Sequence, residues 1–468
     1  MLFFAKIFSR YYKPGIRKHF CIKLRNTRMN DDLDIKNKIM KRFFIFLLFT
    51  VIIWLFPDTA EADDWPRWRG PRGNSISNEK GWNPNALDGG AKILWKINVG
   101  KGYSSVSVKS GYLYTMGNID DKDIVYCLNA KTGEEVWRFA YDAPVKNWGG
   151  PFSTPLIDGG HVYTLSRKGD LYCLFSGNGQ KRWSADITST EYGATKPKYG
   201  FSSSPVIDGN KIILNACKHG LAVDKNTGKK IWASPPGKCG YATPVFYTFK
   251  GKKCAAIFAH RRINGVDLET GELLWDFPWI FNDGADAPDP VVVGNRVFIS
   301  TAYGNGGTML EFTSNNKRAN QHWFRKDLQN EFGSSIYIDG YLYVPQGDTR
   351  HSTAYLKCVN FDTGKDMWTR DTGHCSLIYV DGKFIVLNQW GELLFMEASE
   401  KGYKDLSRAK VIQTSSKVRC WTAPVLADGS IYIRTNTGDL VCVDVSRASS
   451  SVQEGVHHLG VGASGSSR

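Results

Sequence analysis

The sequence repeats itself about every 45 residues, and this period constrains the fold more than any other feature. Each unit has a small residue, a Ser-Pro-like pair and a short apolar stretch, then a turn glycine, an apolar run, a polar turn, a second apolar run and Gly-x-x-x-Trp. The turn glycines are Gly111, Gly159, Gly209, Gly251, Gly294, Gly340, Gly382 and Gly429. Their spacings, 42 to 50 residues, match the size of one four-stranded propeller blade.

Within each unit the apolar residues alternate and are bounded by Asp-Gly or similar turns, which is typical of antiparallel hairpins. Eight copies predict an all-β, eight-bladed β-propeller over residues 91–446. The last copy ends after three strands, at Val445. We therefore expect residues 91–100, AKILWKINVG, to supply its outer strand and close the ring.

A tryptophan ends most of the units, on the predicted outermost strand just after a tight turn. An indole there can be buried between neighbouring blades. The predicted docking residues are Trp137, Trp183, Trp232, Trp275, Trp323 and Trp368, of which Trp323 lacks the glycine. Cys127, Cys173, Cys358 and Cys442 share one slot of the repeat with Ala222 and Gly265. A slot shared by such small residues predicts buried packing rather than disulfides or a zinc site.

The N-terminal region has a different composition from the repeat. Residues 1–42 carry twelve Lys or Arg and three Asp, and an apolar run follows from Phe43 to Phe56. With Ala60-Glu61-Ala62 after it, this run predicts a secretory signal over residues 1–62 and a mature start near Asp63. An uncleaved membrane anchor is the alternative; Met1, Met29 and Met40 are all candidate starts. Either way, the protein is predicted to be periplasmic or secreted.

Residues 63–90 lead into the propeller, and residues 447–468, rich in Ser and Gly, are predicted to be a flexible tail. Without residues 1–62 the chain has 48 basic and 40 acidic side chains. This small excess gives no reason to expect a nucleic-acid partner. The content of apolar residues, 42%, excludes a disordered chain.

Several stretches, with the blades and their tryptophans, resemble the PQQ-like (pyrroloquinoline-quinone-like) propeller family. They include DWPRWRGPRGNSIS, KPKYGFSSSPVIDG and EKGYKDLSRAKVI. The same repeat builds the propeller lipoprotein of the outer-membrane barrel-assembly machinery and the quinoprotein alcohol dehydrogenases. The resemblance implies a secreted propeller. The chain departs from the lipoprotein in having no Cys near Ala62, and from the dehydrogenases in having no adjacent Cys pair.

The residue just before each innermost strand should lie at the mouth of the central channel. In seven of the eight units it is a ring: Tyr103, Phe152, Phe201, Tyr241, Phe332, His374 and Trp421. These rings form either a collar that stacks a planar cofactor, a sugar or a partner's side chain, or simple packing of the blade tops. Both interpretations stay open.

Loops on the same face carry basic tips: Arg167, Lys168, His219, His260, Arg261, Arg262, Arg350 and His351. They could attract an anionic partner or be solvated singly. Asp283, Asp286 and Asp289 lie on one loop and are a candidate Ca²⁺ site, although their spacing fits no standard loop and Asp is common in turns.

No catalytic motif for hydrolysis or phosphate binding is found in the sequence, and no catalytic residue is assigned. The first hypothesis is a non-enzymatic binding or assembly scaffold in the cell envelope, with a protein or carbohydrate partner and membrane contact only through the signal or anchor. The second is a PQQ-dependent dehydrogenase for an alcohol or sugar, with PQQ and Ca²⁺ as cofactors.

Overall fold

The computed structural model describes residues 64–145, 149–280, 287–348 and 353–447. The predicted signal region 1–62 and the tail beyond Arg447 lie outside these ranges. All regular structure in the described ranges is β, in 35 strands, and none of it is helical. Within the same ranges there is accordingly no helix long and apolar enough to cross a membrane.

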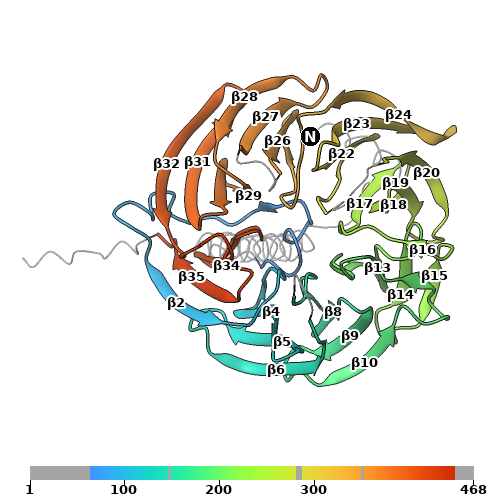
Figure 1. Ribbon diagram of the computed structural model, residues 1–468, viewed down its shortest axis with the longest axis horizontal. Coiled ribbons are helices and arrows are strands. Elements are labelled where there is room, and N and C mark those ends of the chain that lie inside the picture. The colour runs from blue at the N-terminus through green and yellow to red at the C-terminus, as the bar shows by residue number, and fades with distance from the viewer. Residues whose placement is uncertain (1–63, 146–148, 281–286, 349–352, 448–468) are drawn as a thin grey trace, which may run out of the picture. The chain divides into compact units, whose positions relative to one another are not determined.

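The sheets follow one another around a common centre, as in a β-propeller (Figure 1). Two four-stranded sheets come first, with innermost strands β3 and β7. Their strands are β3 (Ser107–Lys109), β4 (Tyr112–Ile119), β5 (Lys122–Asn129) and β6 (Glu135–Asp142), then β7 (Leu156–Asp158), β8 (His161–Leu165), β9 (Asp170–Phe175) and β10 (Lys181–Asp186).

The next sheet, β12–β15, is also four-stranded. β11, just before it in the chain, and β16, just after it, pair to form a separate two-stranded sheet. These strands are β11 (Ala194–Thr195), β12 (Val206–Asp208), β13 (Lys211–Leu214), β14 (Leu221–Asp224), β15 (Lys230–Ala233) and β16 (Gly237–Lys238).

An eight-stranded sheet follows, in the order β17-β18-β19-β20-β24-β23-β22-β21. Its two antiparallel halves meet through one parallel pair, Asp276 with Arg318. The strands are β17 (Val245–Phe249), β18 (Lys252–Ala259), β19 (Arg262–Asp267), β20 (Leu273–Pro278), β21 (Val291–Val293), β22 (Arg296–Thr301), β23 (Gly306–Thr313) and β24 (Asn316–Arg325).

Two sheets complete the C-terminal part before the closing sheet. One is β25 (Ile336–Ile338), β26 (Tyr341–Gln346), β27 (Tyr355–Asn360) and β28 (Asp366–Asp371). The other is β29 (Cys375–Val380), β30 (Lys383–Asn388), β31 (Glu392–Ser399) and β32 (Gly402–Lys410), extended by β1 (Ile76–Ser77), which pairs parallel to β29.

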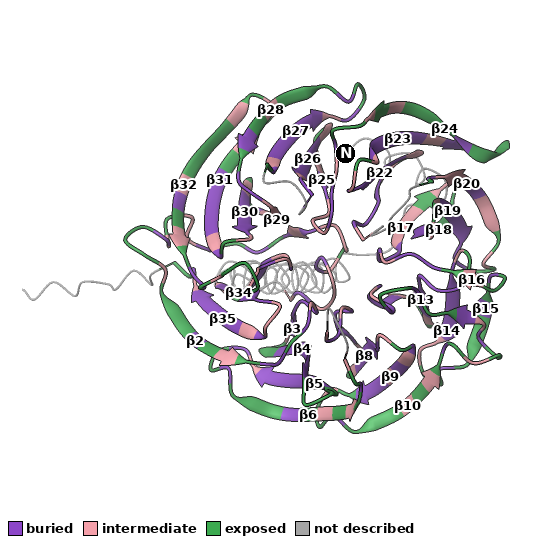
Figure 2. Ribbon diagram, in the orientation of Figure 1, coloured by how far each residue is buried: buried purple, intermediate pink, exposed green. Residues whose placement is uncertain are grey.

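The closing sheet joins the two ends of the propeller. It contains β33 (Val425–Ala427), β34 (Ser430–Arg434), β35 (Asp439–Asp444) and, as its outer strand, β2 (Ile93–Asn98), which runs antiparallel to β35. The prediction that residues 91–100 supply this strand is confirmed. Inner strands are buried on both faces, whereas the outer strands alternate between exposed and covered residues (Figure 2).

The predicted small slot faces the tryptophan of its own sheet. In the β3–β6 sheet, Cys127 stands opposite both Tyr114 and Trp137. The four slot cysteines are at most 1% exposed, which confirms their prediction as packing residues. Burial raises the pKa of Cys127 to about 11, so its thiol is protonated at neutral pH.

Six indole N–H groups bond a carbonyl of the following sheet. Trp137 donates to Ser176 O at 2.7 Å, and its ring covers Gly179, where a Cβ would lie 2.5 Å from the ring. Gly179 also has φ of +70°, so glycine is required twice over. The same bond is made by Trp95, Trp183, Trp232, Trp323 and Trp368.

Trp275 differs from the other predicted docking residues. Its Nε1 donates to the Tyr247 hydroxyl of its own sheet at 2.9 Å, and its ring stacks on Phe312 at 4.5 Å. Gly265 in the small slot makes room, because a Cβ there would lie 2.1 Å from the indole nitrogen. The Trp275 ring is thus buried against the neighbouring half-sheet, 1% exposed, but its N–H bond differs from that of the other six tryptophans.

Residues 64–90, the lead segment, contact sheets that are far apart in sequence. The Trp65 amide bonds Val108 O at 2.8 Å, and Pro66 O accepts from the Ile157 amide. Farther along, Ser75 O accepts from the Tyr379 amide at 2.9 Å. Trp82 packs edge-on against Phe395 at 5.1 Å. Phe395 stands opposite Ser407, where other sheets carry their tryptophan, so Trp82 supplies the missing indole.

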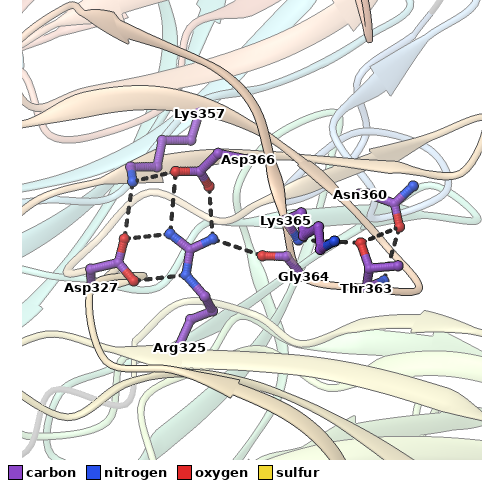
Figure 3. Close-up of polar contacts among 8 residues, drawn as sticks. All are labelled: Arg325, Asp327, Lys357, Asn360, Thr363, Gly364, Lys365 and Asp366. Atoms are coloured by element: carbon purple, nitrogen blue, oxygen red, sulfur yellow. Dashed lines mark hydrogen bonds and ion pairs between the residues drawn. The ribbon is translucent and has the colours of Figure 1, made fainter.

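A four-residue charge network joins the β21–β24 half-sheet to the β25–β28 sheet (Figure 3). Arg325 at the end of β24 bonds Asp327 and, through Nη1 at 2.9 Å, Asp366 at the start of β28. Lys357 on β27 bonds both carboxylates, at 3.0 and 2.9 Å. Hydrogen bonding to Arg325 lowers the pKa of Asp327 well below its usual range.

Candidate functional site

Because neighbouring strands are antiparallel, the loops before the innermost strands and the turns between second and third strands share one face. We call it the collar face, and the opposite one the turn face. Beneath it, a row of side chains, most of them buried, links the residues that precede successive inner strands. Thr154 Oγ1 accepts from the Ser105 amide, Ser204 Oγ from Thr154, Thr243 Oγ1 from Ser204, Asp289 Oδ1 from Thr243, and Ser334 Oγ from Asp289, at 2.7–3.1 Å.

Four of the seven predicted collar rings stack into one column. Tyr103 lies 5.2 Å from Phe152 of the next sheet and 5.6 Å from Trp421 of the preceding one. Trp421 stacks in turn on Phe332 at 4.6 Å. All four are partly exposed. The sequence therefore located the rings, while their mutual stacking across the channel mouth is a tertiary feature.

Two guanidinium groups lie against this column. Arg167 stands 4.7 Å above the Phe152 ring and donates to Tyr199 O at 2.7 Å. Arg419, which the sequence did not single out, lies 5.6 Å from the centre of the Trp421 ring. Burial raises the pKa of Tyr103, while a hydrogen bond with Asn436 and both arginines oppose that rise. The column thus presents ring edges and cationic groups to solvent.

The other three predicted collar residues are placed differently. Phe201 is 1% exposed and packs in the core between the β7–β10 and β12–β15 sheets, so it is not available at the channel mouth. Tyr241 pairs with Tyr199 at 6.0 Å rather than with a ring of the column. His374 lines a small pocket beside the column and packs against Gly347.

That pocket also has two thiols in its wall, Cys375 and Cys420. Burial raises their pKa to about 11 and about 12. Neither is a thiolate at neutral pH, so neither is a prepared nucleophile.

Asp289 takes part in the fold rather than facing solvent. Its Oδ2 accepts from Trp68 Nε1 at 2.7 Å and lies 3.5 Å from Arg69 Nη1, and both groups come from the lead segment. Burial raises the pKa of the Asp289 carboxyl, and Arg69 with the N–H donors opposes that rise. Of the predicted Ca²⁺ ligands, Asp283 and Asp286 lie outside the described residues. In the described ranges no three metal-ligating side chains come together.

The predicted basic rim is only partly free for a ligand. Arg262 pairs with Asp276 at 2.9 Å, and Lys168 Nζ donates to Asp142 O at 3.1 Å. Arg261 is exposed. Burial, Lys218 and Arg262 lower the pKa of His219; burial, Arg261 and Lys238 lower that of His260. Arg350 and His351 lie outside the described residues.

The described residues do not fit PQQ and Ca²⁺. A quinone held by stacking needs an open ring face, yet Tyr103 is stacked between two rings and Phe152 carries Arg167. Ca²⁺ needs several oxygen ligands, and both Asp289 oxygens accept hydrogen bonds from N–H donors. At Tyr103 and Phe152, the chain's own side chains thus cover ring faces on which a planar cofactor would stack.

Comparison with known proteins agrees with this geometry. A family model described as outer membrane protein assembly factor BamB matches residues 85–186 and 121–370, more than half of the chain. The chain belongs to this PQQ-like propeller family. The match covers residues 85–370, which contain the repeats up to β28.

Individual relatives are distant. An outer membrane protein assembly factor BamB from Shigella dysenteriae is 23% identical over 378 residues, 75% of this chain and 88% of that protein. One from Burkholderia pseudomallei is 22% identical over 211 residues, 43% of this chain and about half, 52%, of its own length. The chain also matches 18% of the serine/threonine-protein kinase AfsK of Streptomyces griseus, at 28% identity over 31% of this chain.

Solved structures show the same fold. BamB from Moraxella catarrhalis has a TM-score of 0.53 at 16% identity and covers 75% of this chain and 97% of its own. Quinohemoprotein alcohol dehydrogenase from Comamonas testosteroni has a TM-score of 0.58 at 12% identity, with 83% and 81% covered. At these identities the likeness concerns the fold alone.

Proposed function

We propose that this protein is an exported, non-enzymatic scaffold of the cell envelope that binds a protein partner through its collar face. The family match to assembly factor BamB is the observation that carries the proposal. The stacked column supports it, because aromatic rings with arginines are the side chains that most often anchor protein interfaces. The propeller would provide the binding surface. The predicted secretory signal over residues 1–62 would direct the protein to the cell envelope.

The proposal includes an eight-bladed ring with docked tryptophans. In support, the strands group into eight sets of four if the eight-stranded sheet is divided at its single parallel pair. Six indole N–H groups reach a carbonyl of the following set. A closed ring leaves no open sheet edge, so partners would meet loops and turns rather than strands.

Site-specific crosslinking tests this function. A photoreactive phenylalanine analogue replaces Phe332 in the full chain, expressed in its native host, and the crosslinked product is identified by mass spectrometry. We expect one envelope protein to be captured from Phe332. The same analogue at Tyr112, 42% exposed at the turn face, should capture none.

The quinoprotein alternative has its own readout. PQQ and Ca²⁺ are added to the purified protein, and dye-linked alcohol oxidation is followed together with the melting temperature. The scaffold proposal expects neither turnover nor a dose-dependent rise in melting temperature. Turnover that disappears in Trp421→Ala would contradict the scaffold proposal and establish a quinone site at the column.

A further inference from the structure

In three neighbouring sheets, β7–β10, β12–β15 and β17–β20, the ion pairing of lysines differs between the two faces. On the turn face, Lys211, Lys225 and Lys253 each pair with a carboxylate of an adjacent sheet, Glu269, Asp158 and Asp208 respectively. On the collar face, exposed Lys196, Lys198, Lys218, Lys238 and Arg261 form no ion pair with any described residue. These five cations without carboxylates thus lie on the face assigned to binding; on the turn face of the same sheets, exposed Lys229 likewise makes no ion pair with a described residue.

Backbone contacts place three of these residues, Lys196, Lys218 and Lys238, side by side, and we call all five residues the basic patch. β11 and β16 pair in parallel, with Thr195 opposite Lys238, so Lys196 follows directly beside it. The Lys218 amide donates to Pro235 O at 3.1 Å, and its Cβ lies 3.3 Å from the place a Cβ on Gly237 would take. Lys238 therefore belongs to this short sheet, Lys196 directly follows β11, and the Lys218 backbone lies against the β16 strand.

The remaining two members of the basic patch are Arg261 and Lys198. Arg261 and Lys238 both lower the pKa of His260, and Lys198 follows Lys196 by two residues. The Trp279 amide donates to Arg261 O at 3.0 Å, which places exposed Ile280 beside that arginine. Lys198 Nζ lies 5.1 Å from the ring centre of Tyr199, whose carbonyl accepts from Arg167. Through Arg167 the basic patch is continuous with the ring column.

We propose that the basic patch binds an acidic segment of a polypeptide partner at the collar face. This inference rests on the proposed scaffold function and names the chemistry of its partner. Five clustered cations without carboxylates produce a positive potential that attracts and orients an anionic chain. Tyr199 and Ile280 beside them provide apolar contact for such a segment.

The geometry favours a polypeptide over a lipid surface. Backbone hydrogen bonds hold the main chain at Lys218 and Lys238. Stable binding to a membrane interface would need a broader apolar surface around the cations than Tyr199 and Ile280 provide.

The test measures anisotropy of a fluorescein-labelled decaglutamate peptide with the purified full chain at 20 mM and 200 mM NaCl. The patch variant is K196E/K218E/K238E. The matched control is K229E/K365E/K401E, which makes the same charge change at exposed turn-face lysines. Both must keep the wild-type melting temperature, and a labelled decalysine peptide checks the sign of the interaction.

We expect the wild type to bind decaglutamate at least tenfold more weakly at 200 mM than at 20 mM NaCl, because salt screens exposed charges. The patch variant should lose at least tenfold in affinity at 20 mM, and the control less than threefold. Equal losses in both variants would overturn the proposal in favour of net charge. Binding to phosphatidylglycerol vesicles without binding to decaglutamate would overturn it in favour of a membrane.

No binding to either probe would also overturn the inference. The scaffold function would then still be judged by capture from Phe332, which does not depend on these lysines. Conversely, peptide binding without any captured partner would leave the basic patch standing and remove the proposed function.

Discussion

Contacts between neighbouring sheets are of two kinds. At most junctions the repeat itself supplies the contact, as when the Trp137 indole bonds Ser176 O and covers Gly179. At others a residue from a different part of the chain supplies it. Trp82 of the lead segment fills the place opposite Phe395, and Arg434 of β34 bonds carbonyls of Gly100, Ser104 and Met116.

The difference shows how a repeat is closed into a ring. Residues common to every repeat can stabilise contacts between successive units. The first and last units are not successive in the chain, so their junction needs additional residues. Residues 64–100 and Arg434 provide these contacts at the closing sheet. We therefore expect substitutions at such single contacts to destabilise the protein more than changes at surface positions of the repeat.

The largest effect is expected for Trp82→Ala. Trp82 is 2% exposed, and removing a buried indole costs about 4 kcal/mol of unfolding free energy through lost apolar burial and the cavity left behind. Urea unfolding followed by fluorescence measures the loss. Trp390→Ala, at a half-exposed indole, is the control and should cost less than about 1 kcal/mol. Equal losses would show that the lead segment does not support the ring.

Arg434→Met should come next. Arg434 is 2% exposed, and burial lowers its pKa to about 10. Methionine keeps the apolar stem but leaves three buried carbonyls without this donor, which we expect to cost about 3 kcal/mol after relief of the buried charge. The urea midpoint is compared with that of Arg419→Met at the collar. A midpoint unchanged from wild type would contradict the closing role of Arg434.

Gly265→Ala tests the exceptional tryptophan. The new methyl group would meet the Trp275 indole, so we expect a loss of about 2 kcal/mol and a shift in tryptophan emission as the ring moves. Ala222 already stands opposite Trp232 in the preceding sheet, so the ring has an alternative position to adopt. Gly177→Ala, at an exposed turn with open space, is the matched control. No loss at Gly265 would mean that the slot does not set the indole geometry.

The smallest effect is expected at the charge network. Arg325→Gln should cost about 1 kcal/mol at pH 7, since Asp327 is half exposed and solvent screens the pair. The folded-state pKa of Asp327 is lowered, so its contribution is complete above about pH 4 to 5 and is lost as the pH falls below that range. Melting at pH 7 and pH 3 should therefore show a smaller difference at pH 3. Lys317→Gln on the same strand should show no such pH dependence.

Much of the fold was predictable because the repeat is local. Turn glycines, the slot cysteines and the closing strand β2 all follow from patterns within about 50 residues, and the structure agrees. The hydrogen-bond partner of Trp275 could not be predicted, because it depends on the residue opposite the indole, Gly265, on another strand. The role of Asp289 was missed because its partners Trp68 and Arg69 are about 220 residues away.

The candidate site was less predictable than the fold. Sequence position located the column residues Tyr103, Phe152, Phe332 and Trp421, but gave no way to separate them from buried Phe201. Lys196 and Lys238 come together through β11 and β16, two-residue strands too short to leave a pattern. Among the residues that the sequence analysis missed, Arg419 alone could have been found from the sequence, because it lies two residues before the predicted collar residue Trp421.

The sequence alone determined that residues 91–446 form an all-β repeat and where each sheet turns, since alternation and turn residues act over a few neighbouring positions. The tertiary structure decided which rings stack, which carboxylate is buried and which cations remain unpaired. These outcomes depend on side chains that meet across sheets, and the free energy of each contact is set by burial and by partners distant in the chain.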